Sequence, residues 1–325
     1  MEVSVIIPVY NAARYVRQAV QSALAEPETG EVILIEDGSS DNSLMICQSL
    51  AENNTAVCLL RHPGGVNRGA GASRNLGMIN SQYDYIAFLD ADDYFLPGRF
   101  VVAKGIFMSD YECGGVYEAI GTHIQDEASQ LRWEKSQEMG GELITMTKIV
   151  PPEDLLKNLI MGGAGYFSPI GLVFKRELLS LTGLMNEKLR LHQDNDFIYR
   201  LAAVAKLLPG KLTEPVAVRR IHQHNRITAP RSTNQKFKDR FKMWKETYRW
   251  FRKNADQWQT NLISTRIMSF WMRYYGKQIA ASNEIRREIN KRIFLICLLL
   301  HMPELIFDPV YWITISPSRI RMKFK

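Results

Sequence analysis

Short apolar runs alternate with helical patterns over the first ninety residues of the chain. Val3 to Val9 is a continuous run rich in β-branched residues, which is typical of a parallel strand covered on both faces. Runs at Glu31 to Ile35, Ala56 to Leu60 and Tyr85 to Leu89 predict three further strands. Between the first two, apolar residues recur at helical spacing from Ala12 to Ala25. The pattern predicts β-α repeats whose parallel strands are joined by right-handed crossovers.

Polar residues mark where the intervening helices are expected to begin. Asn11 is expected to cap the first helix, and a residue of Ser39 to Asp41 is expected to cap the second, which runs from about Asn42 to Glu52. A glycine-rich stretch precedes a third helix, predicted from about Ala70 to Ile79. Each predicted strand is thus followed by a polar turn.

The residues that follow the four strands are candidates for a binding site. They are Tyr10 and Asn11, Asp37, Asn67, and Asp90. In open α/β sheets, ligands bind outside the carboxyl ends of the strands. We therefore expect a site along this edge.

Three carboxylates, Asp90, Asp92 and Asp93, directly follow the fourth strand. Like charges this close repel one another, and a divalent cation or a network of donors relieves the repulsion. Mg²⁺ or Mn²⁺ would suit them, since both prefer oxygen ligands. The alternative is a solvated turn in which Asp92 or Asp93 caps a helix that begins near Leu96.

Beyond Pro97 the pattern is less regular, and a polar loop or hairpin is expected at Asp126 to Glu142. Helices are predicted at Pro97 to Phe107, at Pro151 to Met161 and from Asp194. Strands are predicted within Gly114 to Ile124, at Gly171 to Phe174 and at Pro215 to Arg220.

From Asn234 onward the pattern is all-helical. An aromatic stripe at i, i+4, i+7 spacing predicts one buried helix face, formed by Phe237, Phe241, Trp244, Tyr248 and Phe251. Further helices are expected at Leu262 to Ala281 and at Ile285 to Met302. We therefore expect a helical region over residues 231–325.

The composition is that of an ordinary globular protein: 325 residues, 46% hydrophobic and 23% charged. No stretch of eighteen uninterrupted apolar residues predicts a membrane-spanning helix. Glu2 and Pro8 disfavour a signal peptide. Four scattered cysteines fit a reducing compartment, so the expected location is the cytoplasm.

The net charge of +7 is unevenly distributed. Residues 219–325 contain 23 lysines and arginines against 7 acidic residues, whereas the remainder contains 18 against 27. An acidic region with a metal can hold a phosphorylated donor. A basic tail suits anionic lipid, a polyanionic acceptor or nucleic acid.

Four motifs, each after a predicted strand, resemble those of the family 2 glycosyltransferases with the GT-A fold. They are PVYN at Pro8 to Asn11, DGSSD at Asp37 to Asp41, NRGAGASRNLG at Asn67 to Gly77 and DAD at Asp90 to Asp92. The resemblance covers Val3 to Thr228. It implies a mostly parallel, doubly wound α/β sheet, a sugar-nucleotide donor, a divalent metal and inversion at the anomeric carbon.

The resemblance implies a catalytic domain over residues 1–230, with a nucleotide-sugar half at about 1–97 and an acceptor half at about 98–230. Pro8, Tyr10 and Asn11 would supply backbone and an aromatic ring near the base. Asp37 would accept from the ring N–H of uracil, although an Asx turn is the alternative role for it. Asn67 is a further residue expected to bind the donor.

For the diphosphate, Arg74 would pair bidentately with phosphate oxygens. Asp90 would hold the ribose hydroxyls, and Asp92 would ligate the Mn²⁺ or Mg²⁺ ion. His222 falls where many relatives carry a histidine at a strand end, and it is a candidate to reach the metal or the diphosphate. Arg219 and Arg226 are alternatives for the phosphate contact.

The resemblance also implies a general base. Asp194 stands at the second acidic position of the family's ED motif, and Gln193 replaces the preceding Glu. The carboxylate needed for base function is retained, but the contacts of that Glu are lost. Asp196 is the rival, with a structural role expected for it. The glycine-rich stretch Gly162 to Pro169 is expected to line the sugar pocket.

The expected function is an inverting transfer of a sugar from a nucleotide-sugar, UDP-sugar first, to a hydroxyl of a glycan or lipid-linked glycan in cell-surface polysaccharide or glycoconjugate synthesis. The alternatives are a sugar nucleotidyltransferase, which would need a basic glycine loop after the first strand, and a silent nucleotide- or carbohydrate-binding protein. The basic tail fits the inner membrane surface, or packing on protein or in a homo-oligomer; no motif supports nucleic acid.

Overall fold

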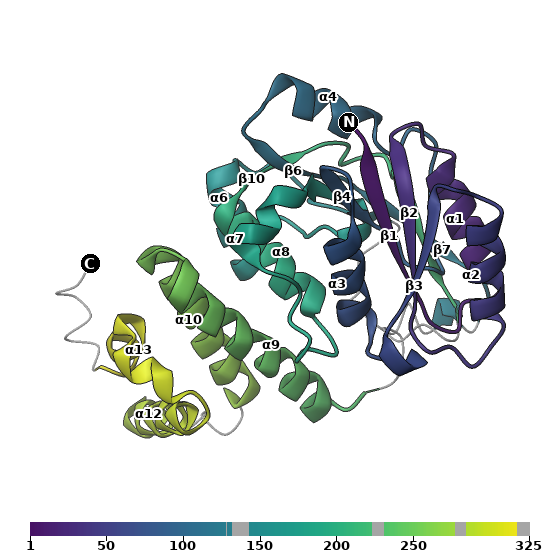
Figure 1. The fold of residues 1–325 in the computed structure, drawn as a ribbon. Helices are drawn as coiled ribbons and strands as arrows, with labels where there is room; N and C mark the ends of the chain where they lie inside the picture. The colour runs from purple at the N-terminus through teal and green to yellow at the C-terminus, as the bar shows by residue number, and fades with distance from the viewer. Residues whose placement is uncertain (128, 132–142, 223–230, 277–283, 317–325) are drawn as a thin grey trace. The chain divides into compact units, whose positions relative to one another are not determined.

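The computed structural model describes residues 1–127, 129–131, 143–222, 231–276 and 284–316. The chain divides into two compact units, Met1–Arg231 and Ser232–Lys325 (Figure 1). Most of the loop expected at Asp126 to Glu142 lies outside the described residues. So do His224 and Arg226, near the end of the first unit.

The first unit is built on a seven-stranded sheet. Its strands, in spatial order, are β10 (Lys206–Pro209), β6 (Cys113–Tyr117), β9 (Leu172–Lys175), β4 (Tyr85–Phe88), β1 (Val3–Val9), β2 (Thr29–Glu36) and β3 (Val57–Arg61). Only β9 runs antiparallel to its neighbours, β4 and β6. The predicted α/β class with a mostly parallel sheet is confirmed.

Helices cover both faces of this sheet (Figure 1). One face carries α1 (Val16–Leu24), α2 (Ser43–Glu52) and α4 (Val101–Ser109); the other carries α3 (Ala70–Asn80), α6 (Pro152–Met161), the short α7 (Leu179–Thr182) and α8 (Gln193–Val204). Short 3-10 turns are η1 (Pro63–Gly65), η2 (Pro169–Gly171) and η3 (Arg176–Leu178). The sheet is therefore doubly wound, as the alternating pattern predicts.

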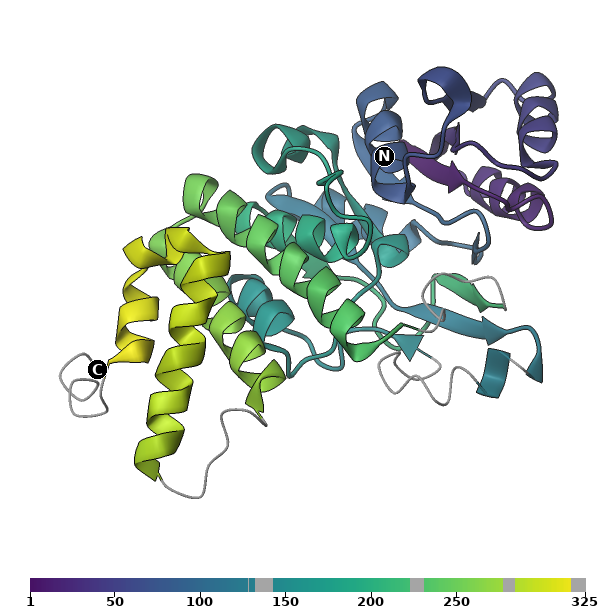
Figure 2. The same ribbon diagram turned by 90° about the horizontal axis from the view of Figure 1, so that it is seen from below.

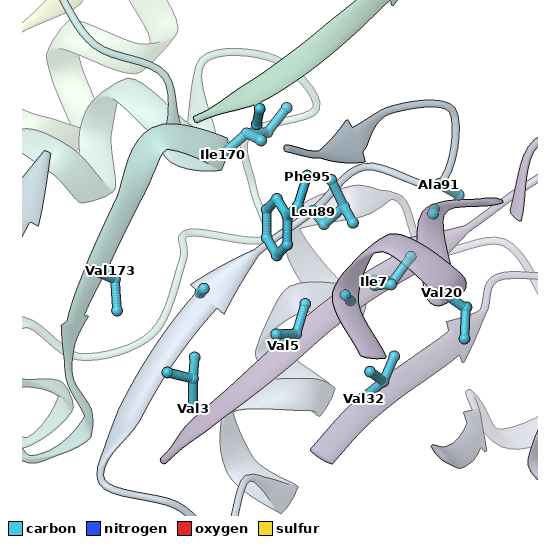
Figure 3. Packing of buried hydrophobic residues seen from close by; sticks show 14 of the residues in the cluster. Val3, Val5, Ile7, Val20, Val32, Leu89, Ala91, Phe95, Ile170 and Val173 are labelled. Atoms are coloured by element: carbon cyan, nitrogen blue, oxygen red, sulfur yellow. The ribbon is translucent and has the colours of Figure 1, made fainter. Parts of the chain in front are cut away.

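The central strand β1 is buried on both sides. Val3, Val5 and Ile7 point into one core, where Val20 of α1 and Val32 of β2 meet them (Figure 3). Ile6 belongs to the opposite core, with Phe88 and Phe174. Because successive side chains of a strand face opposite sides, a continuous apolar run is needed when both sides are covered.

A second, four-stranded sheet lies in the same unit. Its order is β5 (Tyr94–Phe95), β11 (Ala217–Ile221), β7 (Ile120–Ile124) and β8 (Leu143–Ile144). The strands expected within Gly114 to Ile124 are β6 and β7, which lie one in each sheet. Between them, Glu118 accepts a hydrogen bond from the fully buried Arg99 at 2.8 Å. This buried ion pair fixes the chain where it passes from one sheet to the other.

The prediction that Asn11 caps the first helix is wrong. The helix α1 begins at Val16, and Asn11 has a φ of 50° in the turn before it. Its side-chain oxygen accepts a hydrogen bond from the backbone amide of Ser40 at 2.8 Å. The asparagine therefore joins two turns instead of closing a helix end.

The second unit is all-helical, as the pattern predicts. It contains α9 (Thr233–Asn254), α10 (Gln257–Tyr274), α12 (Glu284–His301), the 3-10 turn η5 (Pro303–Phe307) and α13 (Pro309–Ile315). The aromatic stripe of α9 is buried, and its Tyr248 hydroxyl donates to Asp308 at 2.8 Å. Among the described helices, none combines the length and apolar character that crossing a bilayer demands.

Two helical glycines provide a matched test of packing. A Cβ at Gly77 would lie 2.4 Å from Cγ2 of Ile6, whereas one at Gly105 of α4 would meet nothing within 4 Å. We expect Gly77→Ala to lower the free energy of unfolding by about 1–3 kcal/mol, because α3 must move off the sheet. Gly105→Ala should raise it by about 0.5–1 kcal/mol. Denaturant titration of both variants measures this, and equal effects would contradict the described packing.

Candidate active site

The turns that follow β1 and β2 are tied together at the carboxyl edge of the large sheet. The Asn11 amide donates to Ser39 Oγ at 3.0 Å, and Ser40 donates back to Asn11 Oδ1. Pro8 lies within β1, paired with β2 in the sheet. Tyr10 is 51% exposed beside this fixed turn. An accessible aromatic ring is therefore held in place at the sheet edge.

Asp37, at the end of β2, organises the segment that leads into α3. Its Oδ1 accepts from the backbone amide of Arg68 at 2.7 Å, and its Oδ2 from that of Gly69 at 2.8 Å. The Asn67 side chain donates to the Asp37 carbonyl at 3.0 Å. Asp37 is only 2% exposed. Its carboxylate thus holds the turn, and its contact with a donor base stays a prediction.

Arg74 and Asp90, both expected at the donor site, form an ion pair. The guanidinium of Arg74 is buried and lies over the Phe88 ring, 5.6 Å from its centroid. Its Nε has no hydrogen-bond partner among the described residues. The Asp90 side chain remains 39% exposed. The pair therefore presents a carboxylate to solvent, and a buried N–H donor stays unused.

Asp92 and His222 meet although 130 positions separate them in the chain. The Nε2 atom of His222 lies 3.0 Å from Oδ2 of Asp92, and its ring stacks on Tyr15 at a centroid distance of 5.0 Å. A carboxylate oxygen and an imidazole nitrogen are suitable ligands for Mn²⁺. Over the described residues, no group of three or more His, Cys, Asp and Glu side chains could hold a metal ion.

Asp93 is buried beneath this edge. Burial, followed by the negative charges of Asp92 and Asp90, raises the pKa of Asp93 well above its ordinary value. The Arg220 amide donates to Asp93 at 2.8 Å, and the Arg220 guanidinium donates to the Asp92 carbonyl at 2.7 Å. Neither Asp92 nor Asp93 caps a helix, since α4 begins only at Val101. The strand β11 therefore supplies the donors that hold this turn.

Asp194 lies in the first turn of α8, partly exposed, and accepts a hydrogen bond from the amide of Asn195 at 2.9 Å. Partial burial raises the pKa of Tyr166; the positive charge of Arg219 opposes this shift, and the negative charge of Asp194 adds to it. The charge of Arg219 also acts on Asp93.

Asp196, the rival base, is buried in a structural ion pair. Its Oδ2 accepts from Arg200 at 2.8 and 3.1 Å, and Arg200 also donates to the carbonyls of Thr182 and Leu184. Only 2% of Asp196 is exposed. This geometry favours Asp194 over Asp196 as the accessible carboxylate.

Gln193, which replaces the family's Glu, packs against the start of α3. A Cβ at Gly71 would lie 3.2 Å from Cγ of Gln193. Gln193 is 7% exposed, and its Oε1 is buried with no hydrogen-bond partner among the described residues. The residue is therefore a contact between α8 and α3.

The sequence patterns do not single out three residues of this site. Arg220 was expected only as part of a strand, while Tyr15 and Tyr166 were given no individual role. The one available signal was the arginine pair Arg219–Arg220 beside the candidate histidine. The contacts of Tyr15 and Tyr166 join segments far apart in the chain, so local patterns do not reveal them.

Comparison with known protein families shows to which family the chain belongs. The sequence profile described as glycosyl transferase family 2 matches residues 4–180, which is more than half of its length. The chain belongs to this family. The family predicted from the motifs is thus confirmed.

Relatives of this family 2 glycosyltransferase are known from several bacteria. It is 31% identical over 204 residues to the succinoglycan biosynthesis protein ExoU of Rhizobium meliloti; the match spans 62% of this chain and 57% of ExoU. It is 29% identical over 240 residues to an uncharacterized glycosyltransferase of Nostoc sp., spanning 72% and 70% of the two chains. The similarity thus spans little more than half the length of ExoU.

The fold also resembles solved structures. Staphylococcus aureus TarS, residues 1–349 in complex with UDP-GlcNAc, gives a TM-score of 0.64 at 14% identity; the match covers 99% of this chain and 92% of the other. A second structure of the same TarS fragment gives a TM-score of 0.62 at 17% identity. At these identities the likeness establishes the shared GT-A fold.

The role of Asp37 in holding its turn can be tested without any ligand. In Asp37→Asn, one amide N–H would face the new NH₂ group, leaving a buried donor unpaired. We expect the free energy of unfolding to fall by about 1–3 kcal/mol. Asp41→Asn is the matched control: exposed Asp41 accepts the amides of Ala13 and Ser43, and the new NH₂ group can face the exposed Ala13 amide, which water can accept from instead. An equal loss in both variants, measured by denaturant titration, would contradict this role.

Proposed function

We propose that this glycosyltransferase moves a sugar from a UDP-sugar to a hydroxyl of a glycan or lipid-linked glycan, with inversion at the anomeric carbon and with help from Mn²⁺ or Mg²⁺. The observation that carries the proposal is the approach of His222 to Asp92 at the edge where the paired Arg74 and Asp90 also lie. The description of the TarS structure, which names UDP-GlcNAc, supports UDP as the nucleotide. The family assignment weighs against a sugar nucleotidyltransferase.

The donor half of the site uses groups from two strand ends and from the helix α3. Tyr10 offers an exposed ring on which the uracil base stacks, beside the turn fixed by Asn11. Asp90 accepts from the ribose hydroxyls through its exposed carboxylate. Arg74 holds the diphosphate, because a guanidinium offers planar donors that match phosphate oxygens.

Asp92 and His222 are the residues that would hold the metal ion. Their contacting atoms, a carboxylate oxygen and an imidazole nitrogen, form a donor set that suits Mn²⁺, and the remaining ligands would come from water and the donor phosphates. Bound there, the cation would offset the negative charge that develops on the departing diphosphate. Tyr15 stacks on the imidazole and limits its rotation.

Asp194 is the general base. It accepts the proton of the acceptor hydroxyl as that oxygen attacks the anomeric carbon from the side opposite the diphosphate. An uncharged hydroxyl is a weak nucleophile, so removing its proton during attack lowers the barrier. The half-exposed Tyr166 beside Asp194 lies in the glycine-rich stretch Gly162 to Pro169, which we assign to the sugar pocket.

The acceptor class rests on the relatives. ExoU is named for succinoglycan biosynthesis, which favours an acceptor that is a growing polysaccharide or its lipid-linked precursor. We assign the catalytic reaction to residues 1–230, with the nucleotide-sugar half at about 1–97. The helical residues 231–325 would then act outside the chemical step.

Replacing the base should separate chemistry from binding. We expect Asp194→Asn to lower kcat by roughly 100- to 10,000-fold, the usual contribution of general-base catalysis, while the Kd for UDP stays unchanged. Transfer from a panel of UDP-sugars and calorimetric binding of UDP measure the two quantities. A variant with full turnover would exclude Asp194 as the base. A variant that loses UDP binding as well would place it in the donor site.

Replacing the proposed metal ligands should act on UDP binding instead. For the wild-type chain we expect Mn²⁺ to tighten UDP binding and EDTA to reverse this. Asp92→Ala and His222→Ala should each remove the Mn²⁺-dependent part of the affinity and leave the metal-free affinity in place. Binding of UDP that is equally strong with and without Mn²⁺ in the wild type would overturn the proposed metal site.

A further inference from the structure

The helix α12 carries a row of exposed aliphatic side chains. Ile289, Ile293, Ile296 and Leu300 follow one another at i, i+4, i+7 and i+11, and they are between 51% and 81% exposed. A row with this spacing forms one continuous face of a helix. Soluble surfaces carry single apolar side chains, but contiguous ones mark an interaction site.

The orientation of this face is fixed by contacts on the opposite side of α12. Leu295 and Leu298 are fully buried. The indole N–H of Trp271 in α10 donates to the Phe294 carbonyl at 2.8 Å, and the Tyr311 hydroxyl of α13 donates to the Leu295 carbonyl at 3.1 Å. The exposed row therefore lies on the side of α12 opposite these contacts with α10 and α13; Figure 2 shows these helices beside α12.

The segment that follows α12 adds aromatic side chains to the exposed apolar surface of this unit. Phe307 of η5 is 80% exposed, and Trp312 of α13 is 47% exposed with its indole N–H donating to the Ile306 carbonyl at 2.7 Å. We call Ile289, Ile293, Ile296, Leu300, Phe307 and Trp312 the apolar set. Trp and Phe are typical of helices that lie in the interfacial region of a bilayer.

Charge indicates which partner would cover the apolar set. Residues 232–325 contain 19 lysines and arginines against 7 acidic residues. On α12 itself, Arg286 and Arg287 are exposed one turn or less before Ile289. A second copy of so basic a unit would be repelled, whereas an anionic lipid surface would attract it. Aliphatic side chains also suit acyl chains and offer nothing to the phosphates of a nucleic acid.

We propose that the apolar set is a docking surface for a membrane rich in anionic phospholipid. The helix α12 would lie along the bilayer surface, with its aliphatic row among the acyl chains and its arginines at the headgroups. This inference does not rest on the proposed sugar transfer. Either could fail while the other holds.

The test uses the full chain and two kinds of vesicle. In flotation experiments, we expect the chain to bind vesicles of phosphatidylcholine mixed with phosphatidylglycerol, and to bind phosphatidylcholine alone much more weakly. Raising the salt concentration should weaken binding, because screening acts on the arginine–headgroup attraction. The double variant Ile293→Ser/Leu300→Ser should lower the partition coefficient by roughly tenfold or more, since fewer carbons enter the acyl region.

A matched control replaces exposed apolar residues of the first unit. Ile79→Ser/Met108→Ser removes side chains that are 64% and 67% exposed, and it should leave vesicle binding unchanged. A second variant, Arg286→Gln/Arg287→Gln, should reduce the preference for phosphatidylglycerol. Transfer to a soluble acceptor should be the same in all these variants.

Three results would overturn the proposal. The first is a wild-type chain that stays in solution with phosphatidylglycerol vesicles, and the second is a double variant of α12 that floats as well as the wild type. The third is light scattering that shows a wild-type dimer and a monomeric double variant, because the apolar set would then be the contact between two copies of this chain.

Discussion

The site depends on how three neighbouring carboxyl groups are accommodated at one edge of the sheet. They follow β4, and two other segments supply their partners: α3 supplies Arg74 to Asp90, and the end of β11 supplies His222 to Asp92 and the amide of Arg220 to Asp93. Without such partners the like charges would repel one another and raise the cost of folding the turn. The edge is therefore complete only when α3 and the second sheet have both packed against β4. The contacts of these carboxyl groups therefore link the assembly of the fold to the assembly of the site.

What could be predicted from the sequence was local. The burial of β1 on both faces follows from a seven-residue run in which only Ser4 is polar, and the buried stripe of α9 follows from its spacing. What could not be predicted depends on distant partners. Asn11 has the chemistry of a helix cap, but its hydrogen bonds go to the turn after β2. The short strands β5 and β10 carry too few residues for a pattern, and they exist because β11 and β6 offer edges to pair with.

The same distinction holds within the candidate site. The motifs predicted Asp90 and Asp92 after the fourth strand and Arg74 within the third helix, and the structure has them there. They did not give the partners: Tyr15 stacks on His222 across more than two hundred residues of sequence. Nor did they show that both oxygens of Asp37 accept backbone amides. A carboxylate at a strand end is compatible with ligand contact and with turn formation, and only its neighbours in space distinguish the two roles.

These contacts also connect the two halves of the proposed reaction. Asp37 holds the amides of Arg68 and Gly69, and so sets where α3 begins. Gln193, the residue just before the proposed base Asp194, packs against Gly71 of that helix. The helix α3 also carries Arg74, the proposed ligand of the diphosphate. A shift of α3 would therefore move the group that holds the leaving diphosphate and the segment that carries Asp194 together. In-line displacement needs the base and the leaving diphosphate on opposite sides of one carbon. A support shared by Arg74 and the segment of Asp194 keeps the separation of these two groups constant.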